Sequence, residues 1–181
     1  MSNNAKRIEI AAIAVALLAC AGFAYYEYAE ANAIVIDPDR AYPVAYVVDG
    51  DTLKVKIDSH VVTVRLLGIN TPETVDPRKP PECFGKEASD VSKSLLTGMK
   101  IKLAFNPNRE QKDKYGRYLA YVYRDDGLFV NEFLVENGYA REYTFNHEQY
   151  LFQDEFRQAE AKAREAKKGL WEACPADLKS K

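Results

Sequence analysis

Hydrophobic and polar residues alternate with a period of two at residues 53–57, and a valine-rich segment lies on each side of this one along the chain. The segments cover residues 44–48, 53–57 and 61–69, and each is rich in valine, leucine or isoleucine. Residues 49–51 and 58–59 separate them with aspartate, glycine and serine, which are typical turn residues. Alternation of this kind is typical of strands with one buried face, so the pattern predicts a meander of three strands.

A helical period marks three later segments. Gly85–Met99 and Leu128–Asn137 each carry an apolar stripe, and Gly138 is expected to end the second of these helices. A longer helix is expected between Asn146, which can cap it, and Gly169. Its apolar stripe consists of Phe152, Phe156, Ala159, Ala163 and Ala166.

Two more alternating segments, Lys100–Phe105 and Tyr118–Tyr123, bring the expected number of strands to five. Five strands with three interspersed α-helices, in this order, predict an oligonucleotide-binding (OB) type barrel, a mostly β fold of the α+β class. We assign residues 43–174 to this domain, residues 27–42 to a linker and residues 175–181 to a C-terminal tail.

The N-terminal segment has the features of an export signal. Lys6-Arg7 precedes seventeen uncharged residues between Glu9 and Glu27, a length that fits a membrane anchor or a cleaved signal peptide. Residues 17–20, Leu-Leu-Ala-Cys, also resemble a lipoprotein cleavage box with Cys20 as the lipidated residue. The remaining alternative is an N-terminal helix that is buried in the soluble domain.

Every export alternative leads to the same topology. Because the basic residues precede the apolar stretch, the positive-inside rule places the C-terminal domain outside the cytoplasm. We therefore expect an exported protein. It is anchored in the membrane by residues 1–26 if they are retained, and secreted or periplasmic if they are cleaved.

The charge balance does not favour a protein that coats nucleic acid. The chain has 25 basic and 27 acidic residues, and the two counts become equal when residues 1–40 are left out. Proteins that coat duplex DNA are usually basic, because phosphate neutralisation drives that binding. A nucleic-acid function would therefore depend on a local site, as in an enzyme with one or two phosphate-binding arginines.

The three cysteines argue against a zinc centre and leave a disulfide open. Cys20, Cys83 and Cys174 include no C-x-x-C pair, and the chain has only two histidines. In an exported domain, Cys83 and Cys174 could form a disulfide that ties the loop after Glu73 to the C-terminus. Two free thiols are the alternative, and the sequence does not decide between them.

Two segments place charged residues where a strand pattern would favour apolar ones. The first combines residues 49–52, Asp-Gly-Asp-Thr, with residues 65–73, Arg-Leu-Leu-Gly-Ile-Asn-Thr-Pro-Glu; the second is residues 113–117, Asp-Lys-Tyr-Gly-Arg. Phosphodiester hydrolysis needs oxygen ligands for a hard cation, a carboxylate that activates water, and guanidinium groups that hold the phosphate. The segments offer all three: oxygen ligands at Asp51, Asn70 and Thr71, a carboxylate at Glu73, and guanidinium groups at Arg65 and Arg117.

The spacing of these motifs resembles the thermonuclease family, whose type member is staphylococcal nuclease. The resemblance continues in residues 84–88, 130–132, 147–149 and 169–171, and it covers about residues 43–173. It implies an OB-type barrel with three helices and a monomeric, calcium-dependent nuclease. The implied substrates are DNA and RNA, preferably single-stranded, and the implied products have 3′-phosphate ends.

The resemblance also implies a calcium site. Asp51 would be a direct ligand of Ca²⁺, and Thr71 would contribute its backbone carbonyl. Family members often have aspartate where this chain has Asn70, which would serve as a further ligand through its amide oxygen. Because calcium affinity depends on the charge of the ligands, metal binding is expected to be weaker here.

The remaining implied roles concern the reaction and the substrate. Glu73 would act as the general base or position the attacking water, and Arg65 and Arg117 would clamp the scissile phosphate. Lys114 and Tyr115 would contact the terminal phosphate and the sugar of the substrate.

The resemblance is less direct for the residue that would stack on a base of the substrate. The loop between Gly138 and His147 is shorter than in the type member, where tyrosines stack on a base. Tyr143 is the candidate for this role, and a tyrosine of the core or rim is the alternative.

A non-catalytic module that binds nucleic acid or protein on the same fold is the alternative function. Inactive copies of the domain would be expected to lose catalytic carboxylates or arginines. This chain keeps Asp51, Arg65, Glu73 and Arg117, which favours an enzyme.

Overall fold

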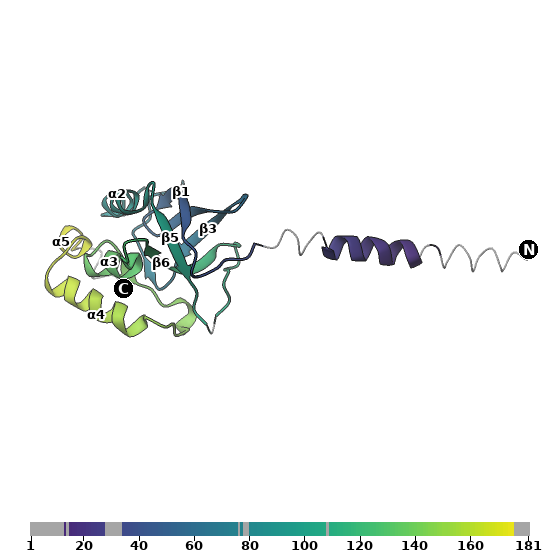
Figure 1. Cartoon of the computed structure of the whole chain (residues 1–181). Helices are drawn as coiled ribbons and strands as arrows, with labels where there is room; N and C mark the ends of the chain where they lie inside the picture. Colours follow the sequence, from purple (N-terminus) through teal and green to yellow (C-terminus); the bar gives the residue numbers. More distant parts are fainter. Residues whose placement is uncertain are drawn as a thin grey trace, which may run out of the picture. The chain divides into compact units, whose positions relative to one another are not determined.

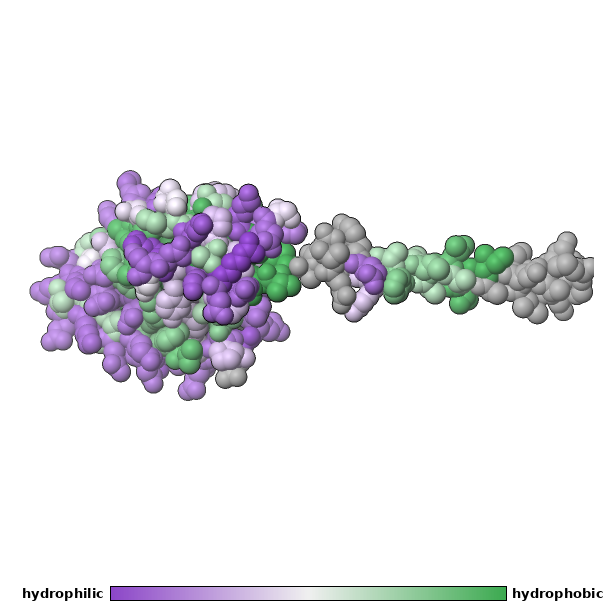
Figure 2. All heavy atoms as spheres, viewed as in Figure 1, coloured by the Kyte–Doolittle hydropathy of each residue, from purple (hydrophilic) through white to green (hydrophobic). Residues whose placement is uncertain are grey.

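The computed structural model describes residues 13, 15–27, 34–75, 77, 80–107 and 109–175, which belong to two compact units divided after Val35. In the first unit residues 15–27 are helical, and Figure 2 shows mainly hydrophobic residues along them. Within the described residues, no helix has both the length and the apolar character that crossing a bilayer requires. The predicted export segment, residues 1–26, lies partly outside the described residues, as does the predicted tail.

The described part of the second unit contains seven strands, five of which close into a barrel. The strands are β1 (Tyr42–Asp49), β2 (Thr52–Ile57), β3 (His60–Leu66), β4 (Ile69–Asn70), β5 (Lys100–Ala104), β6 (Tyr118–Arg124) and β7 (Arg141–Glu142). The barrel order is β1-β2-β3-β6-β5, with β5 pairing back to β1, and this confirms the predicted OB-type architecture (Figure 1). Only β3 and β6 pair in parallel; the other barrel pairs are antiparallel, and β4 pairs with β7 in a separate sheet.

The three predicted helices are α2 (Gly85–Leu96), α3 (Val130–Glu136) and α4 (Gln153–Glu165). The structure adds a short helix, α5 (Leu170–Ala173), and a 3₁₀ turn, η1 (Phe145–His147). Helix α2 lies against β1, whereas α3 packs on α4 at another side of the barrel (Figure 1). The helices therefore support the barrel from two sides.

The alternation of residues along the strands produces the core. In β2 the side chains of Leu53, Val55 and Ile57 are buried, whereas Lys54 and Lys56 remain accessible to solvent. The predicted stripe of α4 is buried at Phe156, Ala159 and Ala163, whereas the half-buried Phe152 precedes the helix and Ala166 lies beyond its end. Each large apolar side chain that is fully buried in this way contributes about 1.5–3 kcal/mol.

Several element boundaries differ from the sequence-based predictions, and two of these differences lie at special backbone conformations. The third strand ends at Leu66 instead of Ile69, because Gly68 adopts a φ of 80° and forms a turn before β4. The prediction that Asn146 caps the long helix is wrong, since Asn146 lies in η1 with a φ of 50° and α4 begins only at Gln153. The N-cap position of α4 is occupied by Phe152, so Asn146 lies too far before the helix to cap it.

The end of α3 and the start of α5 meet at two glycines, Gly138 and Gly169. Gly138 has a φ of 72°, and its amide and that of Tyr139 bond back to the last turn of α3 in a Schellman arrangement. The amide of Leu170 donates to the carbonyl oxygen of Gly138 over 2.9 Å. A Cβ atom at Gly138 would lie 2.2 Å from the carbonyl oxygen of Lys168, so the two backbones can meet only because glycine stands there.

A disulfide joins Cys83 to Cys174, which confirms the bonded alternative over two free thiols. The two residues are 91 apart in sequence, and their Cα atoms lie 6.0 Å from each other. In the chain-entropy account, a cross-link over a loop of this length stabilises the fold by about 4–5 kcal/mol. Cys174 is buried with Ala163, Leu170 and Trp171, and Phe84 packs against this cluster.

Candidate active site

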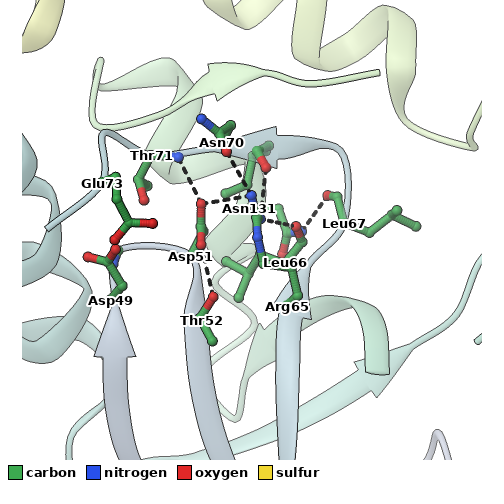
Figure 3. Close-up of polar contacts among 12 residues, drawn as sticks. Asp49, Asp51, Thr52, Arg65, Leu66, Leu67, Asn70, Thr71, Glu73 and Asn131 are labelled. Atoms are coloured by element: carbon green, nitrogen blue, oxygen red, sulfur yellow. Dashed lines mark hydrogen bonds and ion pairs between the residues drawn. The ribbon is translucent and has the colours of Figure 1, made fainter. Parts of the chain in front are cut away.

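The candidate active site lies where the turn between β1 and β2 meets the end of β3 (Figure 3). Thr52, directly after this turn, is the register partner of Arg65, and the pairing brings Asp51 next to Arg65. Helix α2 supports the turn, because the hydroxyl of the buried Ser92 donates to the carbonyl oxygen of Gly50 over 2.5 Å. The barrel register therefore assembles two motifs that are separate in the sequence.

The guanidinium group of Arg65 connects the parts of the site. Its Nη2 lies 2.9 Å from both Asp51 Oδ2 and Asn70 Oδ1, and its Nη1 donates to the carbonyl oxygens of Leu66 and Ile69 over 2.8 and 2.9 Å. The side chains of Arg65 and Asp51 are only 13% and 9% exposed, so solvent screens this ion pair little. Removing one partner of such a pair leaves a buried charge uncompensated and typically costs about 3–5 kcal/mol.

Oxygen atoms of Asp51, Asn70 and Thr71 lie together beside this ion pair (Figure 3). Asp51 Oδ2 also accepts a hydrogen bond from the amide of Thr71 over 2.9 Å. The hydroxyl oxygen of Thr71 is buried, and it has no hydrogen-bond partner within the described part of the chain. A Cβ atom at Gly50 would lie 2.7 Å from this oxygen, so the glycine keeps the space beside it open.

This set of oxygen atoms suits a hard cation such as Ca²⁺, which binds carboxylate, amide and carbonyl oxygens with flexible geometry. Among the described residues, no group of three or more His, Cys, Asp or Glu side chains is arranged to hold a metal. The ligands would therefore be mixed, with the Asp51 carboxylate, the Asn70 amide oxygen and an oxygen of Thr71. The unpartnered hydroxyl of Thr71 is the structural observation that supports this fit.

Glu73 and Asp49 lie side by side at the edge of this network (Figure 3). Glu73 Oε1 accepts hydrogen bonds from the amides of Thr74 and Val75 over 2.9 and 2.7 Å. Asp49 Oδ1 accepts from the hydroxyl of Thr74 over 2.7 Å and from the amide of Gly50 over 2.8 Å. Thr74 thus binds both carboxyl groups and holds them close together.

The pKa of Asp49 is raised above its usual value. Burial is the main cause, and the carboxyl groups of Glu73 and Asp51 add to it, although the hydrogen bonds from Thr74 and Gly50 favour the ionised form. Asp49 belongs to one of the sequence motifs, but the sequence alone assigns it no role. An acidic residue at the end of a strand was the available signal, and only the fold reveals that it faces Glu73.

Residues 113–117 form a turn that presents Arg117. Asp113 Oδ2 accepts from Arg117 Nε over 2.7 Å, and Asp113 Oδ1 accepts from the amides of Tyr115 and Arg117. Burial opposes ionisation of Asp113, but these hydrogen bonds outweigh it and lower the pKa of the carboxyl. Arg117 directly precedes β6, whose Leu119 is the register partner of Arg65, so the second guanidinium group starts from the neighbouring strand.

The predicted substrate-binding residues lie at the exposed rim of the domain. Tyr115 is 72% exposed, and the charged groups of Lys114 and Arg117 lie over its ring. Tyr143 is 45% exposed and follows β7, where its amide bonds to the turn before β4. Phe145, which the sequence motifs do not include, is exposed to a similar extent in the same segment.

The structure therefore brings the predicted residues together in two groups. Asp51, Arg65, Asn70 and Thr71 contact one another directly, and Glu73 follows at the edge of their network. Lys114, Tyr115 and Arg117 arrive on the separate 113–117 turn, and Tyr143 arrives with β7.

Comparison with known proteins agrees with this arrangement. The family model described as staphylococcal nuclease homologue matches residues 63–173. A thermonuclease of Staphylococcus hyicus is 41% identical over 133 residues, which cover 74% of this chain and 76% of that protein. A thermonuclease of Staphylococcus intermedius is 40% identical over 137 residues, which cover 74% of this chain and 77% of that protein. The endonuclease YncB of Bacillus subtilis (strain 168) is 39% identical over 124 residues, which cover 68% of this chain and 58% of that protein.

The raised pKa of Asp49 predicts how its replacement changes stability with pH. The fold disfavours the ionised carboxyl, so the wild type loses stability as the pH rises through the raised pKa. In excess chelator, Asp49→Asn should therefore be more stable than the wild type at neutral pH. The difference should vanish below about pH 4, where aspartate is protonated in both the folded and the unfolded state. Urea unfolding at several pH values measures this.

Asp58→Asn is the matched control, because Asp58 is an exposed aspartate that forms an ion pair with Arg40. It should give no stabilisation at neutral pH. An Asp49→Asn variant that is destabilised by the same amount at every pH would contradict the assigned origin of the shift.

Proposed function

This chain belongs to the staphylococcal nuclease family, and from this premise we propose that it is a calcium-dependent nuclease that hydrolyses phosphodiester bonds in DNA and RNA. The proposed substrates are preferably single-stranded, and the proposed products carry 3′-phosphate ends. The observation that carries the proposal is the partly buried network of Asp51, Arg65, Asn70 and Thr71, with the Glu73 carboxyl beside it. The proposed enzyme acts as a monomer.

The chemistry divides among these residues. Asp51, Asn70 and Thr71 would hold Ca²⁺ through oxygen atoms, and when bound the ion would neutralise negative charge on the scissile phosphate. Glu73 would position the attacking water and take its proton. Its carboxyl is already oriented for this task by two backbone amides.

The two arginines would bind the phosphate and stabilise the charge that develops in the transition state. Arg65 is held by two carbonyl oxygens through Nη1 and by Asp51 and Asn70 through Nη2. A phosphate would therefore bind through Nε or replace Asp51 or Asn70 as the partner of Nη2. Asp113 binds Arg117 through Nε, and a bidentate contact with phosphate would use other nitrogens of the same group. Tyr115, Lys114 and Tyr143 at the rim would contact the sugar, the terminal phosphate and a base of the substrate.

We also propose that the enzyme works outside the cytoplasm. The Cys83–Cys174 disulfide supports this, because such bonds persist mainly in oxidising compartments. The apolar N-terminal segment after Lys6 and Arg7 supports it independently.

The proposed activity predicts cleavage of single-stranded DNA by the purified chain in the presence of Ca²⁺ and loss of cleavage in excess chelator. Product length on gels measures the cleavage, and susceptibility of the product ends to a 3′-phosphatase shows which P–O bond is broken. Asn70→Asp is the matched variant: an added carboxylate should lower the calcium concentration that gives half activity. Undiminished cleavage in chelator rejects the metal assignment, and binding of DNA without cleavage favours a non-catalytic module.

The assigned roles predict different kinetic losses. Glu73→Gln should lower kcat by roughly 10²–10⁴ while the protein remains folded, because general-base help is lost. Arg65→Lys and Arg117→Lys keep the charge but lose the planar fork, so kcat should fall far more than substrate affinity. Lys114→Ala should weaken substrate affinity and change kcat only modestly. Near-normal turnover in both arginine variants, with wild-type circular dichroism, would contradict the proposal that the two arginines hold the phosphate.

The proposed location predicts that cells producing the full chain contain the nuclease activity in the periplasmic, membrane or medium fraction. Assays on fractionated cells measure this, and a variant with Lys6 and Arg7 changed to glutamate, which reverses the charge before the apolar segment, is the control. Activity confined to the cytoplasmic fraction of the wild type would reject export.

A further inference from the structure

Glu73 lies in an irregular segment between β4 and α2, and one short stretch of chain holds the two ends of that segment together. The amide of Glu82 donates to the carbonyl oxygen of Glu73 over 2.8 Å, and Glu82 Oε2 accepts from the amide of Glu73 over 3.2 Å. The next residues continue this contact: a Cβ atom at Gly85 would lie 3.2 Å from the carbonyl oxygens of both Pro72 and Glu73. Residues 82–85 therefore brace the backbone of Glu73.

The brace is itself fixed by the disulfide. Cys83 follows Glu82 directly and is bonded to Cys174, which is buried in the cluster around α5. Phe84 packs against the same cluster, and its ring is stacked on that of Tyr139 at 5.7 Å. Phe84 also adopts a φ of 66°, a conformation that a bulky residue keeps only when its surroundings hold it.

Residues 82–85 contact Glu73 through the two hydrogen bonds of Glu82, a residue that is exposed to solvent, and through the packing of Gly85. On its other side, Glu73 is followed by Thr74, whose hydroxyl donates to Asp49 at the end of β1. Hydrogen bonds at an exposed position contribute little, because water competes for both partners. Arg65, Asp51 and Asn70 are held differently, by β2, β3 and β4 and by one another. Loss of the disulfide is therefore expected to disturb the position of Glu73 more than that of the phosphate and metal ligands.

We propose that the Cys83–Cys174 disulfide is a positioning element for Glu73, so that full turnover requires the oxidised protein. This inference rests on the proposed nuclease function. A dithiol reductant would transfer two electrons and two protons to the disulfide, which yields two cysteine thiols and the cyclic disulfide of the reductant. The enzyme would then be much less active in a reducing compartment than in an oxidising one.

The test compares the oxidised full chain with the same protein reduced by dithiothreitol, with the state of Cys83 and Cys174 verified by alkylation and mass spectrometry. We expect kcat on single-stranded DNA to fall roughly ten-fold to a hundred-fold on reduction, as for a misplaced catalytic group. KM and the calcium concentration for half activity should change less than three-fold. Removal of the reductant and reoxidation should restore kcat.

A second readout does not depend on activity. Hydrogen exchange of the Glu82 amide, which bonds to Glu73, should become faster on reduction, whereas the amide of Thr71, which bonds to Asp51, should remain protected. Absence of nuclease activity in the oxidised protein would reject the proposed function. Hydrogen exchange in the same protein would still test whether the disulfide holds residues 82–85 against Glu73. The two failures are therefore distinguishable.

Three variants complete the design. Cys20→Ser, treated in the same way, removes any effect of the free cysteine, and it should respond to reduction as the wild type does. Gly127→Ala strains a turn whose φ is 88° and leaves the disulfide intact, so it should lower stability without lowering kcat. Glu82→Ala keeps the disulfide but removes one bond to Glu73, and it should lower kcat by a smaller factor than reduction.

Fully reduced wild type that stays folded by circular dichroism and keeps its kcat within two-fold would overturn the proposal. So would unchanged exchange of the Glu82 amide. The proposal would also be overturned if Gly127→Ala, at an equal loss of stability, lowered kcat as much as reduction does. The disulfide would then act only through general stability.

Discussion

The guanidinium group of Arg65 is largely withdrawn from solvent, and its donors are used by Asp51, Asn70 and two backbone carbonyl oxygens. A charged group can be buried in this way only when its partners are held in place, because an unpaired buried charge is strongly destabilising. The partners come from the turn before β2, from the end of β3 and from β4. Folding of the barrel and compensation of this charge therefore depend on each other.

The barrel meets this requirement through register and turn chemistry. Thr52 lies opposite Arg65 on one side, and Leu119 lies opposite Arg65 on the other, so three neighbouring strands contribute to one end of the barrel. Glycine at position 50 leaves room for Thr71, and Gly68 makes the tight turn that returns Asn70 to the guanidinium group. The same contacts that close the sheet thus assemble the candidate active site.

Much of this arrangement could be predicted from the sequence, because it depends on local periodicity. The period of two at Leu53, Val55 and Ile57 reports the buried face of β2, and the stripe at Phe156, Ala159 and Ala163 reports that of α4. The ordered motifs identified the residues of the Arg65 network for the same reason, since each motif ends a predicted strand.

What the sequence could not predict depends on three-dimensional proximity or on single backbone dihedrals. The contact of Asp49 with Glu73 joins residues from different segments, and no local pattern reports it. Asn146 lies in η1 with left-handed dihedrals, and α4 begins only at Gln153, although asparagine is a good N-cap by composition alone. The pairing of Cys83 with Cys174 required the distance between them, which only the packing of α5 determines.

The contact between Gly138 and the residues just before α5 has a consequence for the order in which the domain is completed. A ribosome releases the chain from its N-terminus, so every barrel strand is available before residues 169–174 emerge. Until then Gly138 lacks the amide of Leu170, and Cys83 lacks its partner. Helix α5 therefore completes the domain. A nascent chain that ends before it contains every residue of the candidate active site, but it lacks the hydrogen bond to Gly138 and the disulfide partner of Cys83.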